Sequence, residues 1–280
     1  MQFDSFPSSS RPSIPLKCAL TIATSDSGGG AGIEADLKTF AAHGVFGFCV
    51  MSAVTAQNTM AVASLEALSP QMVTDQLQAL YDDFEIGAIK IGLLGNAANT
   101  QAVVKFLGEK LHQTPLVLDP VMVSTSGHTF LANEAIEALK DLMCLATVIT
   151  PNLPEAAVIS GQSIADDEER LAAAKKISAQ SSGANVLIKG GHGQSAEAKD
   201  LLYGPKVEKW FTSPRINTLN THGTGCTLSS AICANLASGL DLADSVAKAK
   251  KYVSEALNNS INLGRGPGPL NHFYKFYEIG

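Results

Sequence analysis

A glycine-rich turn runs directly into a helix in the stretch NTHGTGCTLSS, residues 220–230. After it, Leu228, Ile232 and Leu236 recur at helical spacing, and Gly239 follows as a C-cap. The two glycines of this stretch allow the backbone to approach an anion closely. The first N–H groups of the helix, together with its dipole, favour negative charge at the same place. The stretch therefore predicts an anion-binding turn.

Cys226 stands at the beginning of this helix, where the pKa of a thiol tends to fall. A second interpretation stays open, in which an ordinary glycine-rich loop precedes a packed helix and Cys226 is a small buried side chain. The glycines alone favour this second interpretation. The decision between the two therefore rests on the remainder of the chain.

The composition is typical of a large α/β protein. The chain has 280 residues, of which 45% are hydrophobic and 16% charged, so it can bury a sizeable core. A formal net charge of −6 argues against nucleic acid or an anionic membrane as the main partner. It leaves room for a phosphorylated ligand. We expect no membrane span, because no run of 18 apolar residues occurs.

The cysteines and the first residues bear on location and domain organisation. Five cysteines form no CxxC pair, which predicts free thiols in a reducing, cytoplasmic compartment and neither a disulfide framework nor a zinc site. Residues 1–15 are rich in serine and proline and lack the apolar segment of a signal peptide. We expect a disordered extension over 1–15, followed by a single domain over 16–280.

Short apolar runs alternate with amphipathic stretches along the chain. Strands are predicted at 18–23, 45–56, 86–91, 116–118, 147–150 and 186–188, with a hairpin at 201–203 and 207–211. Helices are predicted at 31–43, after Pro70, at 97–112, 133–143 and 166–181, after the glycine-rich stretch, and at 242–263. This alternation predicts a three-layer α/β/α sandwich with a mostly parallel central sheet.

Polar residues follow nearly every predicted strand, whereas the loops at the opposite strand ends are plainer. The polar residues at the strand ends are Asp26, Gln57, Asp119, Asn152 with Glu155, and Lys189. In a parallel sheet the carboxyl ends of the strands meet at one edge, and ligands bind there. The dinucleotide fingerprint GxGxxG does not occur, so a dinucleotide-binding fold is disfavoured.

Three of these residues suit phosphate chemistry. Asp119 and Glu155 could hold Mg²⁺ partly through water, although either could instead cap a loop, and Glu155 could lie in the first helical turn after Pro154. Lys189 lies between Ile188 and two glycines and can reach a phosphate. With the anion-binding turn they match the parts of a phosphoryl-transfer site. A P-loop enzyme is excluded, because GxxxxGK[ST] does not occur.

The predicted helix at 31–43 carries one carboxylate on the shoulder of its buried face. Asp36 has this position, and a buried carboxylate requires a partner. It could form a cap or salt bridge, or it could accept a hydrogen bond from a polar ligand. Glu34 and Lys38 are four residues apart on the opposite face and are interpreted as a solvated pair.

Eight segments carry a resemblance to a known family, in its order and spacing from Leu20 to Phe273. They are SDSGGGAGIEADLKTF (25–40), TAQNT (55–59), KIGLLG (90–95), LDPVM (118–122), TPNLPEA (150–156), IKGGH (188–192), NTHGTGCTLSSAI (220–232) and GPGPLNHF (266–273). The sequence closely resembles the hydroxymethylpyrimidine and hydroxymethylpyrimidine-phosphate kinases of thiamine biosynthesis, within the ribokinase-like family. The resemblance implies a ribokinase-like fold, usually a homodimer.

The resemblance also implies a reaction and its site. ATP and Mg²⁺ would serve to phosphorylate 4-amino-5-hydroxymethyl-2-methylpyrimidine and then its monophosphate. The implied pyrimidine pocket consists of Ala31, Asp36, Gln57, Leu93 and Val121. The residues implied to face Mg²⁺ and ATP are Asp119, Asn152, Glu155, Lys189 and Thr224. Gly223, Thr224 and Gly225 would form the anion hole, and Cys226 would replace the aspartate base of most relatives.

Other functions stay open at this point. A pyridoxal kinase of the same branch shares the GTGC element, although the TAQNT segment and the TPNLPEA spacing favour the pyrimidine enzyme. A hydrolase could use Cys226 as its nucleophile with His222 or His192, but this leaves the carboxylates and Lys189 without a role. A non-catalytic ligand sensor is the remaining alternative.

Overall fold

The computed structural model describes residues 16–111, 113–122, 133–191 and 196–276. Among these residues, nine strands form one sheet in the order β3-β2-β1-β4-β5-β6-β7-β8-β9. The strands are β1 (Cys18–Thr24), β2 (Phe46–Gln57), β3 (Val62–Ala67), β4 (Ala88–Ile91), β5 (Leu116–Leu118), β6 (Val148–Ile149), β7 (Asn185–Ile188), β8 (Glu197–Gly204) and β9 (Val207–Pro214). Strands β2, β1 and β4 to β7 are parallel, and β3, β8 and β9 are antiparallel additions at the two edges. The predicted mostly parallel sheet is confirmed.

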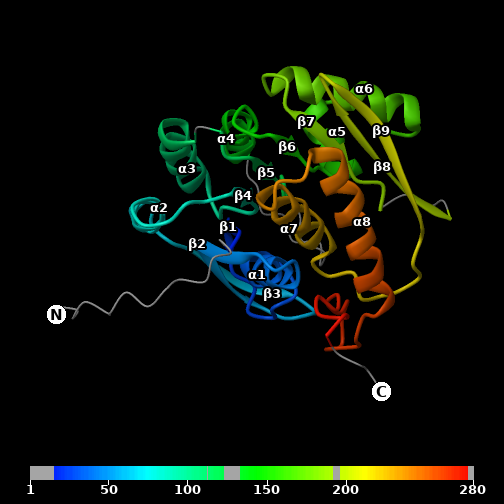
Figure 1. The fold of residues 1–280 in the computed structure, drawn as a ribbon, viewed down its shortest axis with the longest axis horizontal. Helices are drawn as coiled ribbons and strands as arrows, with labels where there is room; N and C mark the ends of the chain where they lie inside the picture. The colour runs from blue at the N-terminus through cyan, green and yellow to red at the C-terminus, as the bar shows by residue number, and fades with distance from the viewer. Residues whose placement is uncertain (1–15, 112, 123–132, 192–195, 277–280) are drawn as a thin grey trace.

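Helices cover both faces of the sheet (Figure 1). They are α1 (Gly32–Ala42), α2 (Pro70–Tyr81), α3 (Ala97–Lys110), α4 (Asn133–Met143), α5 (Leu153–Ser160), α6 (Asp167–Gln180), α7 (Thr224–Ala237) and α8 (Leu242–Asn258). Figure 1 shows α7 and α8 side by side, and α7 also contacts α1. On the other face α2 contacts α3, α3 contacts α4, and α5 contacts α6. This is the predicted three-layer sandwich.

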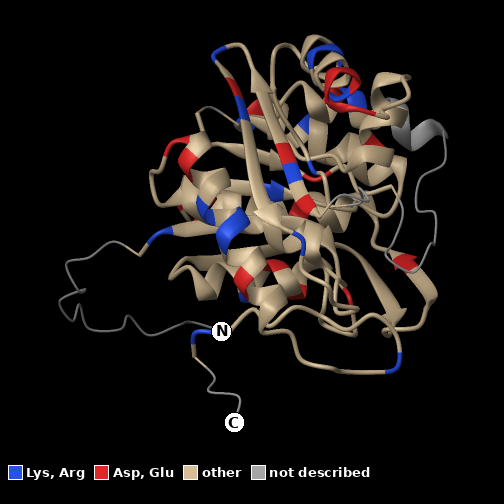
Figure 2. Ribbon diagram, turned by 90° about the vertical axis from the view of Figure 1, so that its right-hand side faces the viewer, with Lys and Arg blue, Asp and Glu red and all other residues tan. Residues whose placement is uncertain are grey.

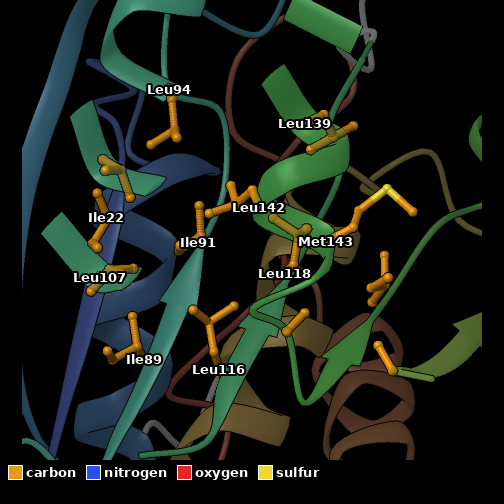
Figure 3. Packing of buried hydrophobic residues seen from close by; sticks show 14 of the residues in the cluster. Ile22, Ile89, Ile91, Leu94, Leu107, Leu116, Leu118, Leu139, Leu142 and Met143 are labelled. Atoms are coloured by element: carbon orange, nitrogen blue, oxygen red, sulfur yellow. The ribbon is translucent and has the colours of Figure 1, made fainter. Parts of the chain in front are cut away.

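The strands are buried on both faces because their side chains alternate between two cores. In β5, Leu116 and Leu118 pack in the larger core, and Val117 packs on the opposite side beneath α7 and α8. Figure 3 shows the larger core, where leucine and isoleucine side chains from β1, β4 and β5 meet Leu107 of α3 and Leu142 of α4. Because both faces of these strands are buried, residues at consecutive positions are apolar, and the strands appear as continuous apolar runs in the sequence.

The structure differs from the sequence prediction at three elements. Strand β3 was not predicted, because it is an edge strand with mostly exposed or half-buried side chains. Helix α5 has only 8 residues, and the sequence left a helix after Pro154 open without predicting its extent. Helix α8 ends at Asn258 and not at residue 263, since the apolar side chains of Ile261 and Leu263 are 40% and 54% exposed and give no core contact that would extend the helix.

The distribution of charge and of apolar residues does not point to a particular ligand or partner. Figure 2 shows positive and negative residues interspersed over the face that it presents. Within the described ranges, no helix has the length and apolar character needed to cross a bilayer. The predicted extension at 1–15 lies outside the described residues.

The strand order determines where a ligand can bind. β1 lies between β2 and β4, so the chain builds the sheet first on one side of β1 and then on the other. A crevice forms outside the carboxyl ends of strands at such a switch point. The loop after β1, the segment after β4 and the first turn of α7 all come to this edge of the sheet.

Candidate active site

The first turn of α7 is seated directly on the loop that follows β1. Gly223 is the N-cap of α7 and has a φ of +82°, a left-handed conformation that favours glycine. A Cβ atom at this position would lie 1.8 Å from the carbonyl oxygen of Gly30. Both the backbone conformation and the close approach therefore require glycine here.

The N-terminus of α7 has no side-chain cap, unlike most helices of this protein. Side-chain oxygens accept hydrogen bonds from the first turns of α2, α3, α5, α6 and α8, and the caps are Ser69, Asn96, Asn152, Asp166 and Asp241. Helices α1 and α7 have no such bond, and they begin next to each other. The first N–H of α7, from Thr224, donates to the carbonyl of Thr221 at 3.2 Å, and the first N–H of α1, from Gly32, bonds to Cys226. The following N–H groups in the first turns lack intrahelical partners and are the donors that both helices could offer to an anion at this edge of the sheet.

An ion pair lies beside this turn. Lys189 Nζ is 2.8 Å from Oδ1 of Asp119, whose side chain is 2% exposed. A Cβ atom at Gly225 would lie 3.2 Å from the same ammonium and 3.6 Å from Oδ2 of Asp119. Burial raises the pKa of Asp119, but Lys189 and Lys90 more than offset this effect, so the pKa lies below its ordinary value. The structure thus brings together three of the predicted phosphate-site residues.

Glu155 lies next to this ion pair and begins α5. Asn152 accepts from the N–H of Glu155 at 2.9 Å, and the Glu155 carboxylate accepts from the N–H of Asn152 at 2.7 Å, which is a capping box. The sequence left a first-turn position open for Glu155, and the structure confirms that position. Burial, with the nearby Asp119 carboxylate, raises the pKa of Glu155 to about 7, although Lys189 lowers it.

The expected low pKa of Cys226 is wrong. Burial raises the pKa of this thiol to about 11, and Lys90 lowers it only in part. The hydrolase alternative requires an activated thiol with a histidine beside it. Nε2 of His222 is instead 2.8 Å from Oδ2 of Asp26, and His192 lies outside the described residues. The described geometry therefore provides no activated nucleophile.

Asp26 organises the glycine-rich loop after β1. Its carboxylate accepts from the N–H groups of Gly28 at 2.8 Å, Gly30 at 3.1 Å and Ala31 at 2.9 Å, in addition to His222. Burial raises the pKa of Asp26, but these bonds outweigh it and the pKa is lowered. Because His222 directly precedes Gly223, this contact fixes the loop to the turn that opens α7.

Glu34 and Lys38 are not the solvated pair that their spacing suggested. Glu34 accepts from Ser25 Oγ at 2.6 Å and from the N–H of Asp26 at 2.7 Å. Lys38 donates to the carbonyl of Gly29 at 2.6 Å. Both side chains therefore hold the loop after β1 against α1.

The residues of the implied pyrimidine pocket fall into separate groups. Leu93 and Val121 line one pocket together with Asp119. Ala31 and Gln57 belong to the adjoining loop region, where Gln57 Nε2 is 3.4 Å from Nε2 of His222. The apolar residues Leu93 and Val121 therefore lie beside the Asp119–Lys189 pair, whereas Gln57 lies beside the glycine-rich loop after β1.

Both carboxylate oxygens of Asp36 already have protein partners. Its side chain is completely buried, and it accepts hydrogen bonds from Thr21, Lys90 and Ser230. The salt-bridge alternative that the sequence left open for Asp36 is therefore the one observed. The predicted contact of Asp36 with the pyrimidine ring stays a prediction.

Two arrangements at the site were missed from sequence, the Asp26–His222 contact and the buried Lys90. Asp26 and His222 are 196 positions apart, and no local pattern pairs them. Lys90 interrupts the apolar strand AIKI, which was a signal that a buried partner was needed.

Comparisons with known proteins decide the family. The profile described as phosphomethylpyrimidine kinase matches residues 26–271. The chain belongs to the phosphomethylpyrimidine kinase family. Within that family it is 46% identical to a hydroxymethylpyrimidine/phosphomethylpyrimidine kinase of Haemophilus influenzae, covering 92% of this chain and 97% of the relative.

Solved structures of phosphomethylpyrimidine kinases and of pyridoxal kinases share the fold. A phosphomethylpyrimidine kinase from Clostridium difficile 630 is 40% identical with a TM-score of 0.76, covering 86% of this chain and 99% of that chain. A Bacillus subtilis pyridoxal kinase, solved as an ADP complex, is 35% identical with a TM-score of 0.86, covering 93% of this chain and 99% of that chain. The ADP complex shows that this pyridoxal kinase, a structural relative of the chain, binds a nucleotide.

Replacing Gly223 tests the close approach of α7 to the loop after β1. Gly239 provides a matched control, since its φ of +86° is also left-handed but no atom lies within 4 Å of a Cβ there. Gly239→Ala should lower the free energy of unfolding by about 1–2 kcal/mol, the cost of the left-handed conformation alone. Gly223→Ala should cost clearly more in urea unfolding, because it also displaces Gly30. Equal losses in the two variants would show that the approach is not tight.

Proposed function

We propose that this member of the phosphomethylpyrimidine kinase family transfers the γ-phosphoryl group of ATP to the hydroxymethyl group of 4-amino-5-hydroxymethyl-2-methylpyrimidine. A second transfer to the monophosphate would give the diphosphate used in thiamine biosynthesis. One observation carries the proposal: the uncapped first turn of α7 opens beside the Asp119–Lys189 pair, within a family of pyrimidine kinases. The relatives named above support the same substrate.

The phosphate half of the site uses the backbone and one lysine. The N–H groups of residues 223–226 would stabilise the charge on the transferring group, because donors fixed in advance need not reorganise. Lys189 and Thr224 would contact the phosphates of ATP, and Asn152 would place the first turn of α5 beside them. In a loose transition state, such positioning supplies most of the catalysis.

The carboxylates fit Mg²⁺. Asp119 and Glu155 lie close enough that the charge of Asp119 raises the pKa of Glu155, and a bound cation would relieve this repulsion. Mg²⁺ usually takes one or two carboxylates together with water and substrate phosphates. Among the described residues no larger cluster of metal-binding side chains occurs. When bound, Mg²⁺ would neutralise charge on the ATP phosphates.

The ring half of the site is formed by the remaining residues of the implied pocket. Leu93 and Val121 would form the apolar wall against the ring, since both line the pocket that reaches Asp119. Gln57 would hydrogen-bond the ring nitrogen and amine, and Ala31 would contact the ring from the start of α1.

The Cys226 thiolate would accept the proton of the substrate hydroxyl as the new O–P bond forms and the bond to ADP breaks. Because the pKa of Cys226 is about 11 in the free protein, only a small fraction is thiolate at neutral pH. As long as the pH is below the pKa, the thiolate fraction increases about tenfold for each unit by which the pH rises. The second transfer differs, because a phosphate monoester is already ionised above pH of about 6 and has no proton to give up.

Substrate preference tests the proposed function directly. With ATP and Mg²⁺, the protein should phosphorylate the pyrimidine with a higher kcat/KM than pyridoxal, and chelating the metal should abolish both reactions. The alternative has its own support, because the TM-score of 0.86 to a pyridoxal kinase is high. A clear preference for pyridoxal would establish that alternative. Ligand binding without ADP release would indicate a sensor.

Cys226→Ala should affect the two phosphorylations unequally. Loss of a general base costs roughly 10²- to 10⁴-fold in rate, so kcat for the alcohol should fall while pyrimidine binding is retained. The rate of the monophosphate reaction should fall much less. In the unmodified protein, kcat/KM for the alcohol should also rise with pH above 7, and this slope should disappear in Cys226→Ala. Normal turnover of the alcohol by this variant would make Cys226 structural.

Assembly and location complete the proposal. A homodimer in the cytoplasm is expected for this family, and the exposed rings of Phe46 and Phe84, which pack around Phe48, offer apolar surface for a contact. Light scattering on the purified protein should give twice the 29.2 kDa mass of one chain. A mass of one chain at micromolar concentration would contradict the dimer.

A further inference from the structure

A buried ion pair lies beneath the first turns of α7 and has no part in the reaction proposed above. Lys90 Nζ is 2.7 Å from Oδ2 of Asp36, and neither side chain has exposed surface. Thr21 Oγ1 donates to the same oxygen at 2.6 Å, and Ser230 Oγ donates to Oδ1 of Asp36. We call these four residues the Lys90–Asp36 cluster.

The cluster connects the centre of the sheet to both helices that begin at the site. Lys90 of β4 and Thr21 of β1 are register partners on adjacent strands. Asp36 belongs to α1, and Ser230 lies in α7 one helical turn beyond Cys226. Every member comes from a different element, so the cluster fixes the distance of α1 and α7 from the strands.

The positive end of the pair lies next to the pocket. Gly92 directly follows β4 and lines the pocket together with Leu93 and Asp119. A Cβ atom at Gly92 would lie 2.8 Å from Nζ of Lys90. The absence of a side chain at position 92 therefore leaves the ammonium directly behind the pocket wall.

Burying two charges is costly, and apolar side chains of similar size often stabilise a protein at least as well as a buried pair. The pair can therefore have a purpose other than stability. A fixed positive charge in a medium of low dielectric stabilises negative charge that develops nearby. In this site such charge arises on the thiolate of Cys226 and on the transferring phosphoryl group.

We propose that the Lys90–Asp36 cluster is a positioning element of the active site, which anchors α7 and holds a fixed positive charge behind Gly92. The inference rests on the proposed function for its effect on turnover. Its effect on Cys226 can be measured without any substrate. Lys90 and Asp36 would act indirectly, by holding α7 in place and by their charge on neighbouring groups.

Four charged groups act on the Cys226 thiol from the elements around it. They are Lys90 on β4, Asp36 on α1, Asp119 after β5 and Lys189 after β7. Lys90 lowers the pKa of Cys226 more than Asp36 raises it. Removing Lys90 and removing the charge of Asp36 must therefore shift the reactivity of the thiol in opposite directions.

The first experiment measures alkylation of Cys226 by iodoacetamide at mildly alkaline pH, followed on the peptide by mass spectrometry. Lys90→Met should slow the reaction about tenfold, and Asp36→Asn should accelerate it about tenfold, because one pKa unit changes the thiolate fraction tenfold. Lys250→Met is the matched control, since it removes the cation of another ion pair, 2.6 Å from Asp200. It should leave the rate unchanged. The exposed Cys49 serves as an internal reference.

The second experiment uses the double variant Lys90→Met/Asp36→Asn, which leaves no buried charge unpaired. Its thermal midpoint should stay near that of the unmodified protein, while kcat for the pyrimidine alcohol falls at least about tenfold with KM unchanged. Unmodified kcat in this variant would show that the pair is only structural. Alkylation shifts of the same sign in Lys90→Met and Asp36→Asn would also overturn the proposal.

These outcomes separate the cluster from the proposed function. If the protein phosphorylates neither ring but the reactivity of Cys226 shifts as expected, the role of the cluster is supported and the proposed function is contradicted. If all variants phosphorylate the pyrimidine normally and the reactivity of Cys226 does not shift, the proposed function is supported and the role of the cluster is contradicted. If Lys90→Met does not fold, Asp36→Asn and the double variant still decide.

Discussion

The close approach of Gly223 to the carbonyl of Gly30 is the constraint on which the rest of the site depends. Only a residue without a side chain can take a φ of +82° with that oxygen so near. The approach brings the uncapped starts of α1 and α7 to one point. His222 and Asp26 then lock the two segments together across 196 positions of sequence. Because the contact is made by backbone, the proposed anion site would already be in place before a ligand binds.

Charge balance in a buried environment explains the side chains around this contact. Lys189 is paired with Asp119 and Lys90 with Asp36, so each buried ammonium has a carboxylate partner. Burial and the nearby Asp119 carboxylate raise the pKa of Glu155 to about 7 although Lys189 lowers it, which marks the place where additional positive charge would be accommodated. Under the proposed function, ATP and Mg²⁺ would bring negative and positive charge together, so their binding would preserve the balance. Such a site can bind a strongly charged ligand with little reorganisation.

The sequence predicted the layers and most strands because both faces of the sheet are buried and the apolar runs are unmistakable. It predicted Asp119, Glu155 and Lys189 as neighbours because carboxyl ends of parallel strands meet at one edge. It could not predict the state of Cys226, since the pKa of a thiol depends on burial as well as on the helix terminus. The partners of Asp36, Glu34 and Lys38 were missed for a similar reason, because they come from other elements or from a folded loop.

A crystal structure with the pyrimidine and a non-hydrolysable ATP analogue would show whether the first turn of α7 binds the transferred phosphate. The γ-phosphate should accept hydrogen bonds from the N–H groups of residues 223–226. The hydroxymethyl oxygen should lie between that phosphate and Sγ of Cys226, with the ring against Leu93 and Val121. A nucleotide whose phosphates bind away from the first turn of α7, with Gly223 still in contact with Gly30, would show that α7 does not form the phosphate site.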